Sequence, residues 1–430
     1  MPIHPPPFPK AAAVHEVVIT GIGIACPLGV ARLDVWSAIE RRQSGVRTLP
    51  WLVEAGFPIT IGGEVPEFDP KQYVKPRKSL KVMSRETQLA FAATELAWGD
   101  AALDEAKLDP ERLGVVLGAN LYRTELEDLI NLYRATDSQG EFDFTRWKEG
   151  MREMYPLWML RYLPNMAACH IGIAHDARGP TNSIVEGDVS ALLTIIEAAD
   201  VVARGHADVM LAGASSTMLS PVDLAWHAGA RMSRNNAHPA EACRPFDARR
   251  NGAVWSEGAT MFVLESRTHA QQRGAKPQAS ILGYGRRCEA SSDSKKPTGQ
   301  AIRQAIDAAL AMSHVPASEI GHVNAHGLGT VEDDAVEARV IQETLGETPV
   351  TAPKSFFGNL GAAGGAAELA ISLLALEQGV VPPTLNFTRP DPECPVNVIS
   401  EPQPARSPAV LALNHKITGQ AVALVVNAEA

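Results

Sequence analysis

Asp188 occupies a position in the chain where a reactive side chain would be well placed. It follows Gly187, where a short β-branched run over 183–185 turns sharply into a helix that ends near Gly205. The N-terminus of a helix carries partial positive charge, which favours an anion or a thiolate beside it. The turn therefore resembles a nucleophile elbow that holds a carboxylate, and the chemistry of the protein depends on what that carboxylate can do.

The helix after Asp188 is predicted to be buried along one side. Its last turn holds Arg204, and Gly205 suits the C′ position that ends a helix. The apolar residues recur at the spacing of a single helical face. They are Ala191, Leu192, Ile195, Ile196, Ala199 and Val202. A helix of this kind would hold the turn at Asp188 in place from below.

Strands alternate with helices along the whole chain, which predicts mostly parallel sheets between layers of helices. The pattern repeats on either side of a polar break at 271–277. We therefore expect two related α/β halves, 16–270 and 271–430, after a Pro-rich, flexible leader over 1–15. Residues 123–160 are rich in charge and aromatic side chains and are expected to form an excursion from the first half.

The composition is that of a globular protein with a large core, since 45% of the 430 residues are hydrophobic and 20% are charged. A net charge of −10 argues against a nucleic-acid binder or a protein that docks on anionic membranes. No apolar run approaches the roughly 18 residues that a membrane helix needs. The five cysteines are scattered without metal-ligand spacing, and Cys169 is expected to be a small core thiol. These features predict a soluble cytoplasmic protein with no metal and no cofactor.

Two local patterns have competing interpretations. The GxGxxC run over 21–26 lacks the third glycine of a dinucleotide fingerprint, so its glycines are expected to serve close backbone packing. The segment Lys71–Lys81 holds five cations and no acid, with Arg85 just beyond it. In an acidic protein this cluster either docks an acidic partner or is simply a solvated loop.

Five longer motifs together resemble the β-ketoacyl-acyl-carrier-protein synthases, in order and in spacing, over about residues 16 to 426. They read GPTNSIVEGDVSA, CRPFDARRNGAVWSEGA, VNAHGLGTVEDDAVE, KSFFGNLGAAGGAAE and VPPTLNFTRPDPEC. The resemblance implies a thiolase-like fold, a duplicated αβαβα arrangement of five layers. It also implies a dimer with active sites next to the interface.

Synthases of this family use a cysteine nucleophile and two histidines, which transfer an acyl group and stabilise an enolate. The resemblance places the nucleophile at Asp188, the first histidine at His326 and the second histidine at Asn359. Lys354 and Glu337 match a supporting lysine and glutamate of the family.

The family resemblance also implies a Gly- and Phe-rich loop near the C-terminus, and in this sequence that loop departs from the family pattern. It begins correctly at Asn414, but 415–421 reads HKITGQA. Three parts of the reaction centre, at Asp188, at Asn359 and in this loop, therefore depart from the family pattern.

An aspartate cannot simply replace the cysteine in condensation. A carboxylate nucleophile would give an acyl anhydride, which is more reactive than the thioester and would tend to hydrolyse. It would also repel the carboxylate of a malonyl group. Three of the remaining residues have structural interpretations: His326 as a backbone-bonded histidine, and Lys354 with Glu337 as an internal ion pair.

Three functions remain open. The first is a non-condensing subunit like the cysteine-less chain-length factors (ketosynthase-β type), which pair with an active paralogue in fatty-acid or polyketide assembly. The second is an enzyme in which Asp188 and His326 hydrolyse, decarboxylate or isomerise an acyl-carrier thioester. The third is a scaffold for acyl carrier protein. The expected partners are acyl carrier protein and an active ketosynthase as a heterodimer, or a second copy as a homodimer.

Overall fold

The computed structural model describes residues 15–120, 125–227, 231–290 and 297–429. The predicted leader over 1–15 lies outside these residues except for His15. Within the described residues, no helix is both long enough and apolar enough to cross a bilayer.

Ten strands of one large sheet fall into two sets of five with the same order. Numbered along the chain within each set, both sets run 1-5-4-2-3 across the sheet. The first set is β1 (Val17–Cys26), β10 (Glu257–Ser266), β9 (Val209–Thr217), β5 (Leu113–Gly118) and β8 (Thr181–Ile184). The second set is β11 (Ala279–Cys288), β17 (Gln420–Ala428), β16 (Ala409–His415), β12 (His322–Asn324) and β13 (Val350–Thr351).

Strand direction repeats with the order. In each set the first two pairings across the sheet are antiparallel and the last two are parallel. The sets join through β1 and β11, which pair only at Val18–Ser280 and Ile19–Ala279. The same order and the same directions confirm the predicted duplication. The prediction of mostly parallel sheets is wrong, because half of the pairings within each set are antiparallel. The chain boundaries of the halves remain a prediction.

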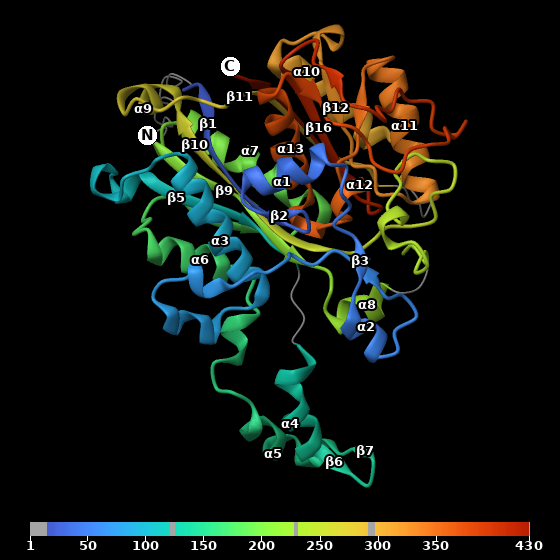
Figure 1. Ribbon diagram of the computed structural model, residues 1–430. Helices are drawn as coiled ribbons and strands as arrows, with labels where there is room; N and C mark the ends of the chain where they lie inside the picture. The colour runs from blue at the N-terminus through green and yellow to red at the C-terminus, as the bar shows by residue number, and fades with distance from the viewer. Residues whose placement is uncertain (1–14, 121–124, 228–230, 291–296, 430) are drawn as a thin grey trace, which may run out of the picture.

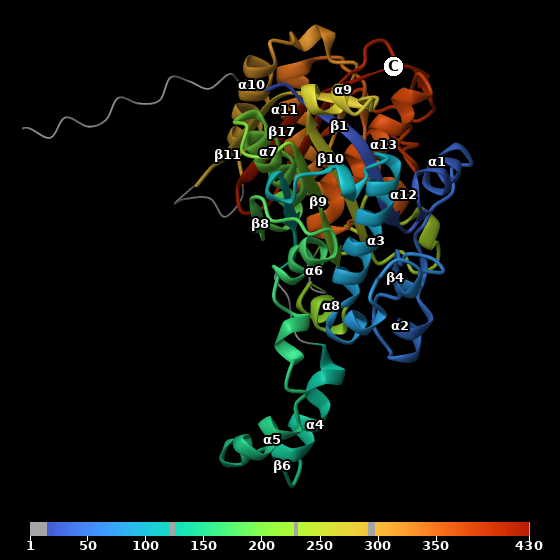
Figure 2. The same ribbon diagram turned by 90° about the vertical axis from the view of Figure 1, so that its left-hand side faces the viewer.

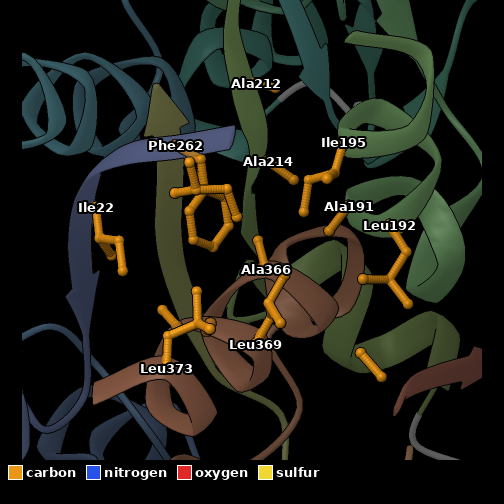
Figure 3. Close-up of a cluster of buried hydrophobic side chains, with 14 of the residues drawn as sticks. Ile22, Ala191, Leu192, Ile195, Ala212, Ala214, Phe262, Ala366, Leu369 and Leu373 are labelled. Atoms are coloured by element: carbon orange, nitrogen blue, oxygen red, sulfur yellow. The ribbon is translucent and has the colours of Figure 1, made fainter. Parts of the chain in front are cut away.

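Two helices fill the space between the sets of strands: α7 (Ser190–Ala203) and α13 (Gly364–Glu377), which contact each other. Figure 3 shows Ala191, Leu192 and Ile195 from α7 near Ala366 and Leu369 from α13, within one buried cluster. All six residues predicted for the buried face of α7 are at most 3% exposed. The prediction of a helix with one buried face directly after Asp188 is therefore confirmed.

The outer helices complete the layers (Figure 1). α3 (Arg85–Asp100) and α6 (Met166–Ala174) cover the first set of strands, and α10 (Gln300–Ser313) and α11 (Val331–Leu345) cover the second. The resulting order is helix, sheet, helix, sheet, helix, as the thiolase-like fold requires. The shorter elements are α1 (Arg32–Glu40), α2 (Pro50–Glu54), α8 (Pro221–His227), α9 (Arg267–Gln272), α12 (Lys354–Phe357), β2 (Gly29–Val30), β3 (Arg47–Thr48), β4 (Ile61–Gly62), β14 (Val380–Val381) and β15 (Gln403–Pro404).

The glycines of the GxGxxC run pack closely, as expected. A Cβ on Gly21 would lie 2.4 Å from the carbonyl oxygen of Ala97, and one on Gly23 would lie 1.9 Å from that of Ala93. The run therefore lets β1 approach α3. The expectation for Cys169 is wrong, because this thiol lies half-buried on α6 instead of in the core.

An arm projects from the body between β5 and α6 (Figures 1 and 2). We define the arm as residues 125–163. It contains α4 (Leu126–Thr136), β6 (Asp137–Ser138), β7 (Glu141–Phe142), α5 (Trp147–Glu153) and the short 3-10 helix η6 (Trp158–Arg161). Its large exposed apolar side chains are Leu126, Ile130, Tyr133, Phe142, Phe144, Trp147, Met151, Tyr155, Leu157, Met159 and Leu163.

Candidate active site

Asp188 lies in the 3-10 turn η7 (Gly187–Val189), which connects β8 to α7. Gly187 has φ +55°, a backbone conformation that glycine adopts without strain. The half-buried Asp188 accepts a hydrogen bond at Oδ1 from the Asn359 side-chain amide, at 3.1 Å. The Asn359 carbonyl oxygen accepts the backbone N–H of Gly361, also at 3.1 Å. Because the Gly361 N–H fixes which end of the amide is the acceptor, the NH2 group must face Asp188.

The duplication explains why these two residues meet. Asn359 precedes the 3-10 turn η10 (Gly361–Ala363), which leads into α13 as η7 leads into α7. The two turns are in contact at the N-terminal ends of the two central helices. The Asn359–Asp188 hydrogen bond thus joins the two halves of the fold at the point where both helices begin.

His326 follows β12 and is 1% exposed. Its Nδ1 lies 3.0 Å from the Lys354 ammonium and 3.2 Å from the Asn414 amide nitrogen. Both neighbours are donors, so Nδ1 must be the acceptor and the neutral ring carries its proton on Nε2. Burial lowers the pKa of His326 well below its usual value, and the charges of Lys354 and nearby His415 and Arg231 lower it further.

Lys354 forms its ion pair with Glu368 on α13, not with Glu337. The predicted Lys354–Glu337 pair is therefore wrong. Both members of the true pair are at most 2% exposed, and Lys354 also donates to the His326 carbonyl oxygen at 2.9 Å. Burial raises the pKa of Glu368, although Lys354 and a 3.0 Å hydrogen bond from Asn414 oppose that shift. Glu368 went unnoticed in the sequence, where a single charge in the apolar stretch 362–376 was a usable signal.

Glu337 instead holds the backbone of the histidine loop. Its carboxylate accepts the N–H of His326 at 2.6 Å and of Gly327 at 2.9 Å. One helical turn earlier on α11, the fully buried Asp334 accepts the N–H of Gly329 at 3.0 Å. Two buried carboxylates thus fix the loop that carries His326. Asp334 gave no separate signal in the sequence.

A second histidine borders this cluster. His415 ends β16, and its ring meets that of His326 edge-on with centroids 4.7 Å apart. Its Nε2 is buried, has no hydrogen-bond partner among the described residues, and lies 3.6 Å from Glu337. His415 appeared in the sequence only as part of the altered loop.

That altered loop is a tight hairpin between β16 and β17. Lys416 and Gln420 close it with a backbone hydrogen bond of 2.9 Å. The Lys416 side chain passes over the elbow, so that a Cβ on Gly187 would lie 3.3 Å from its Cε. The Lys416 ammonium lies 4.0 Å from the Glu186 carboxylate. The Lys416 side chain therefore lies against Gly187, the residue directly before Asp188, with its charge near Glu186.

The predicted residues thus gather in one place but in two groups. Asp188 pairs with Asn359, while His326, Lys354 and Glu337 belong to a connected network with Glu368 and Asn414. Among the described residues, no hydrogen bond links Asp188 to His326. The residues that the structure describes also contain no cluster of three or more acidic, histidine or cysteine side chains that could hold a metal ion.

The sequence matches the profile of the β-ketoacyl synthase N-terminal domain over residues 14–270 and that of the C-terminal domain over residues 278–388. The chain belongs to the β-ketoacyl synthase family. Similarity extends over nearly all of the chain. It is 33% identical over 394 residues to the tetracenomycin polyketide synthase ketoacyl synthase alpha subunit of Streptomyces glaucescens, covering 90% of this chain and 91% of the relative. It is 34% identical over 405 residues to 3-oxoacyl-[acyl-carrier-protein] synthase 2 of Mycobacterium bovis, covering 91% and 92%.

Solved β-ketoacyl synthase structures agree with the fold. A β-ketoacyl synthase from Burkholderia phymatum STM815 superimposes with a TM-score of 0.86 at 27% identity, covering 97% of this chain and all of the other. The ishigamide ketosynthase/chain length factor gives 0.85 at 26% identity with the same coverage. Since the similarity includes proteins of both descriptions, the overall likeness does not separate a condensing synthase from a chain length factor.

Proposed function

We propose that this chain is a non-condensing subunit of the chain-length-factor type, which pairs with a cysteine-bearing ketosynthase in polyketide or fatty-acid assembly. The observation that carries the proposal is the Asn359–Asp188 hydrogen bond at the head of α7. Family resemblance assigns the nucleophile and the second histidine to these two positions. A carboxylate and an amide that bind each other leave neither an attacking thiolate nor a second imidazole there.

Charge also argues against condensation at this site. The Asp188 carboxylate would face the carboxylate of a malonyl group, and like charges at about 4 Å repel by several kcal/mol at the effective dielectric of a protein pocket. Acyl transfer to Asp188 would yield an anhydride, which water cleaves readily. The subunit would therefore help shape a chain-binding site without making the new carbon–carbon bond.

The surface supports a role with partners. The arm exposes a series of aromatic and aliphatic side chains that a monomer would leave in water, and such patches mark interaction sites. The cations of the 71–81 segment are exposed and form no ion pair with another described residue, whereas Arg85 pairs with Glu257 at 2.6 Å. We assign the arm to the ketosynthase partner and the basic segment to acyl carrier protein.

The test is association together with activity. The protein, purified alone, is expected to release no product from acyl- or malonyl-carrier protein. Used as bait in native extract, it is expected to retain a cysteine-bearing synthase in a one-to-one complex. Turnover by the isolated protein that Asp188→Ala abolishes would overturn the proposal.

One observation favours a second candidate, an enzyme of altered chemistry that uses Asp188 and His326. The histidine position is retained and ordered: His326 is buried, its Nε2 carries the proton, and Lys354 and Asn414 fix the ring. The Nε2–H of such a neutral ring can donate a hydrogen bond to a thioester carbonyl oxygen and so stabilise negative charge that develops there. Hydrolysis, decarboxylation or isomerisation of an acyl-carrier thioester by the isolated protein, lost in His326→Ala, would establish this candidate. A one-to-one complex that is active only with its partner's cysteine would exclude it.

A further inference from the structure

A cavity of about 570 Å³ lies where the start of α1 meets the C-terminal ends of α3 and α13. Of these helices, α1 and α13 contact each other directly (Figure 1). The cavity has the size of a small-molecule site. Its lining residues belong neither to the elbow nor to the histidine network nor to the arm. Along α13, Gln378 at the cavity lies about 15 Å from Glu368 in that network. The cavity is therefore a separate site.

The walls of this cavity are mostly apolar. Leu33, which lines it, is 78% exposed, and the Trp36 ring beside it is half-buried. The large apolar side chains of the lining come from β1 and from all three helices. They are Ile22, Leu33, Trp36, Leu96 and Leu374. A bound molecule with a hydrocarbon body would remove apolar surface of this wall from water, which favours binding.

Acidic side chains outnumber basic ones in the lining. The carboxylates are Glu95, Asp100 and Glu377, and Arg32 is the one cation among the described residues that line the cavity. Arg32 donates to both oxygens of Asp100, at 2.8 and 2.9 Å, and also to Glu377. Its guanidinium is thus engaged by two carboxylates. Glu95 lies 3.0 Å from Nε2 of His175, outside the lining. The charge that the cavity presents to a ligand is therefore negative.

Two helix ends add to this negative potential. α3 ends at Asp100 and α13 ends at Glu377, and neither helix has a basic residue in its last turn. A helix C-terminus carries partial negative charge and is stabilised by a cation. Both helices thus place a carboxylate where a cation is preferred, and among the lining residues that the structure describes only Arg32 offsets them. A second cation at this end of the cavity would be stabilised.

We propose that the cavity binds an apolar amine, a small molecule with an ammonium group and a hydrocarbon body. The carboxylates and the two helix ends attract the ammonium group. The Trp36 ring can offer its π face to the same cation, while the aliphatic side chains contact the hydrocarbon body. An apolar carboxylate, such as a fatty acid, is repelled by the same charges.

Three probes that share one phenylbutyl skeleton test this site by equilibrium dialysis with the full-length protein at pH 7. Phenylbutylamine is a cation, phenylbutanol is uncharged and phenylbutyrate is an anion. The amine is expected to bind one-to-one and about tenfold more tightly than the alcohol, and the anion more weakly than both. Added salt should weaken binding of the amine and not of the alcohol. Trp36→Leu, which keeps an apolar wall without the ring, should weaken the amine about fivefold and the alcohol much less.

Gly99→Phe is a second variant that leaves Trp36 intact. Gly99 lines the cavity and nothing lies within 4 Å of a Cβ there, so the phenyl ring has room to fill the space. Binding of the amine and of the alcohol should both fall at least tenfold. Trp51→Leu is the matched control, because it removes a half-buried indole from α2, outside the cavity. It should bind all three probes as the wild type does.

The proposal is overturned if the alcohol or the anion binds as tightly as the amine, or if Gly99→Phe leaves amine binding unchanged. It is also overturned if Trp51→Leu weakens the amine as much as Trp36→Leu does. None of these results bears on partner pairing, so a failed amine site would leave the proposed function intact.

Discussion

The side chains of Asp188 and Asn359 satisfy each other, so a return to thiol chemistry requires changes at both positions. We predict that Asp188→Cys/Asn359→His becomes acylated on residue 188 by acyl-carrier protein, whereas Asp188→Cys alone reacts at least tenfold more slowly. A thiol at a helix N-terminus forms a thiolate more readily, and a neighbouring imidazole accepts its proton. Intact-mass measurement with peptide mapping checks this outcome.

Mapping is needed because Cys288 is exposed and could be modified on its own. The double variant is expected to transfer acyl groups without condensing them, since the 415–421 hairpin keeps its altered sequence. A well-folded double variant that is not acylated would contradict the assignment of the elbow.

The Lys354–Glu368 pair predicts a double-mutant cycle with a large coupling. Removing one partner strands a fully buried charge, so Lys354→Met or Glu368→Leu alone should destabilise the protein by about 3–5 kcal/mol. The double substitution should recover much of that loss, because no unpaired charge remains. Denaturant unfolding of the four proteins measures the coupling.

The exposed pair Arg303–Glu343 provides the control. Either single substitution there should cost less than about 1 kcal/mol, with little coupling. If substitutions in the buried pair cost as little stability as those in the exposed pair, the prediction that the buried network depends on Lys354 would be wrong.

Asp334 predicts a pH dependence of stability. Burial raises the pKa of Asp334 to about 7, so the folded protein binds this proton more tightly than the unfolded chain. Its contribution is fully present at low pH and is lost as the pH rises towards 7. From pH 5 to pH 7 the loss should be on the order of 2 kcal/mol. Asp334→Asn should therefore gain stability relative to wild type as the pH rises, which melting temperatures at pH 5, 6, 7 and 8 would reveal. A constant difference between the two proteins would contradict this prediction.

At the scale of elements, the sequence pattern predicted correctly those features that depend on residues close together in the chain, such as the buried face of a helix. The predicted buried face of α7 is confirmed. Partners distant in sequence were not predictable in this way. Glu368 meets Lys354 because α13 packs back against α12, where Lys354 is the first residue. His415 meets His326 because β16 pairs with β12. The resemblance supplied the site positions, but not which side chains bind one another.

The close packing at the N-terminal turn of α13 predicts that alanine substitutions at two helical glycines have opposite effects on stability. A Cβ on Gly365 would lie 1.9 Å from the Asn414 side-chain oxygen, inside the buried network. Gly365→Ala should therefore destabilise the protein by about 1–3 kcal/mol or more. The matched control is Gly99→Ala on α3, where nothing lies within 4 Å of the new Cβ. That change should stabilise the helix by up to about 1 kcal/mol, and thermal unfolding distinguishes the two. If the two substitutions changed stability equally, α13 would be able to move away from Asn414 without loss of stability, contrary to this prediction.

At the scale of the whole molecule, the arm is expected to matter for association and not for folding. Phe144→Ser/Trp147→Ser removes two exposed aromatic side chains from the arm, so the melting temperature should change little. Recovery of the cysteine-bearing synthase on this bait should fall at least tenfold. Leu33→Ser on α1 removes a side chain that is 78% exposed and should leave recovery unchanged. Equal recovery on both baits would show that the partner binds elsewhere.

The two central helices, which pack against each other, are synthesised at very different times during translation. The apolar face of α7 is covered by α13, which begins at Gly364, long after α7 ends at Ala203. At about 5–20 residues per second, a ribosome needs roughly 8–32 s to make the chain between them. From the end of β10 at Ser266 onwards, the first half has all its strands but lacks the cover of its inner face. Nascent chains of this protein are therefore expected to engage holding chaperones until the second half emerges, and fast translation should reduce aggregation during expression.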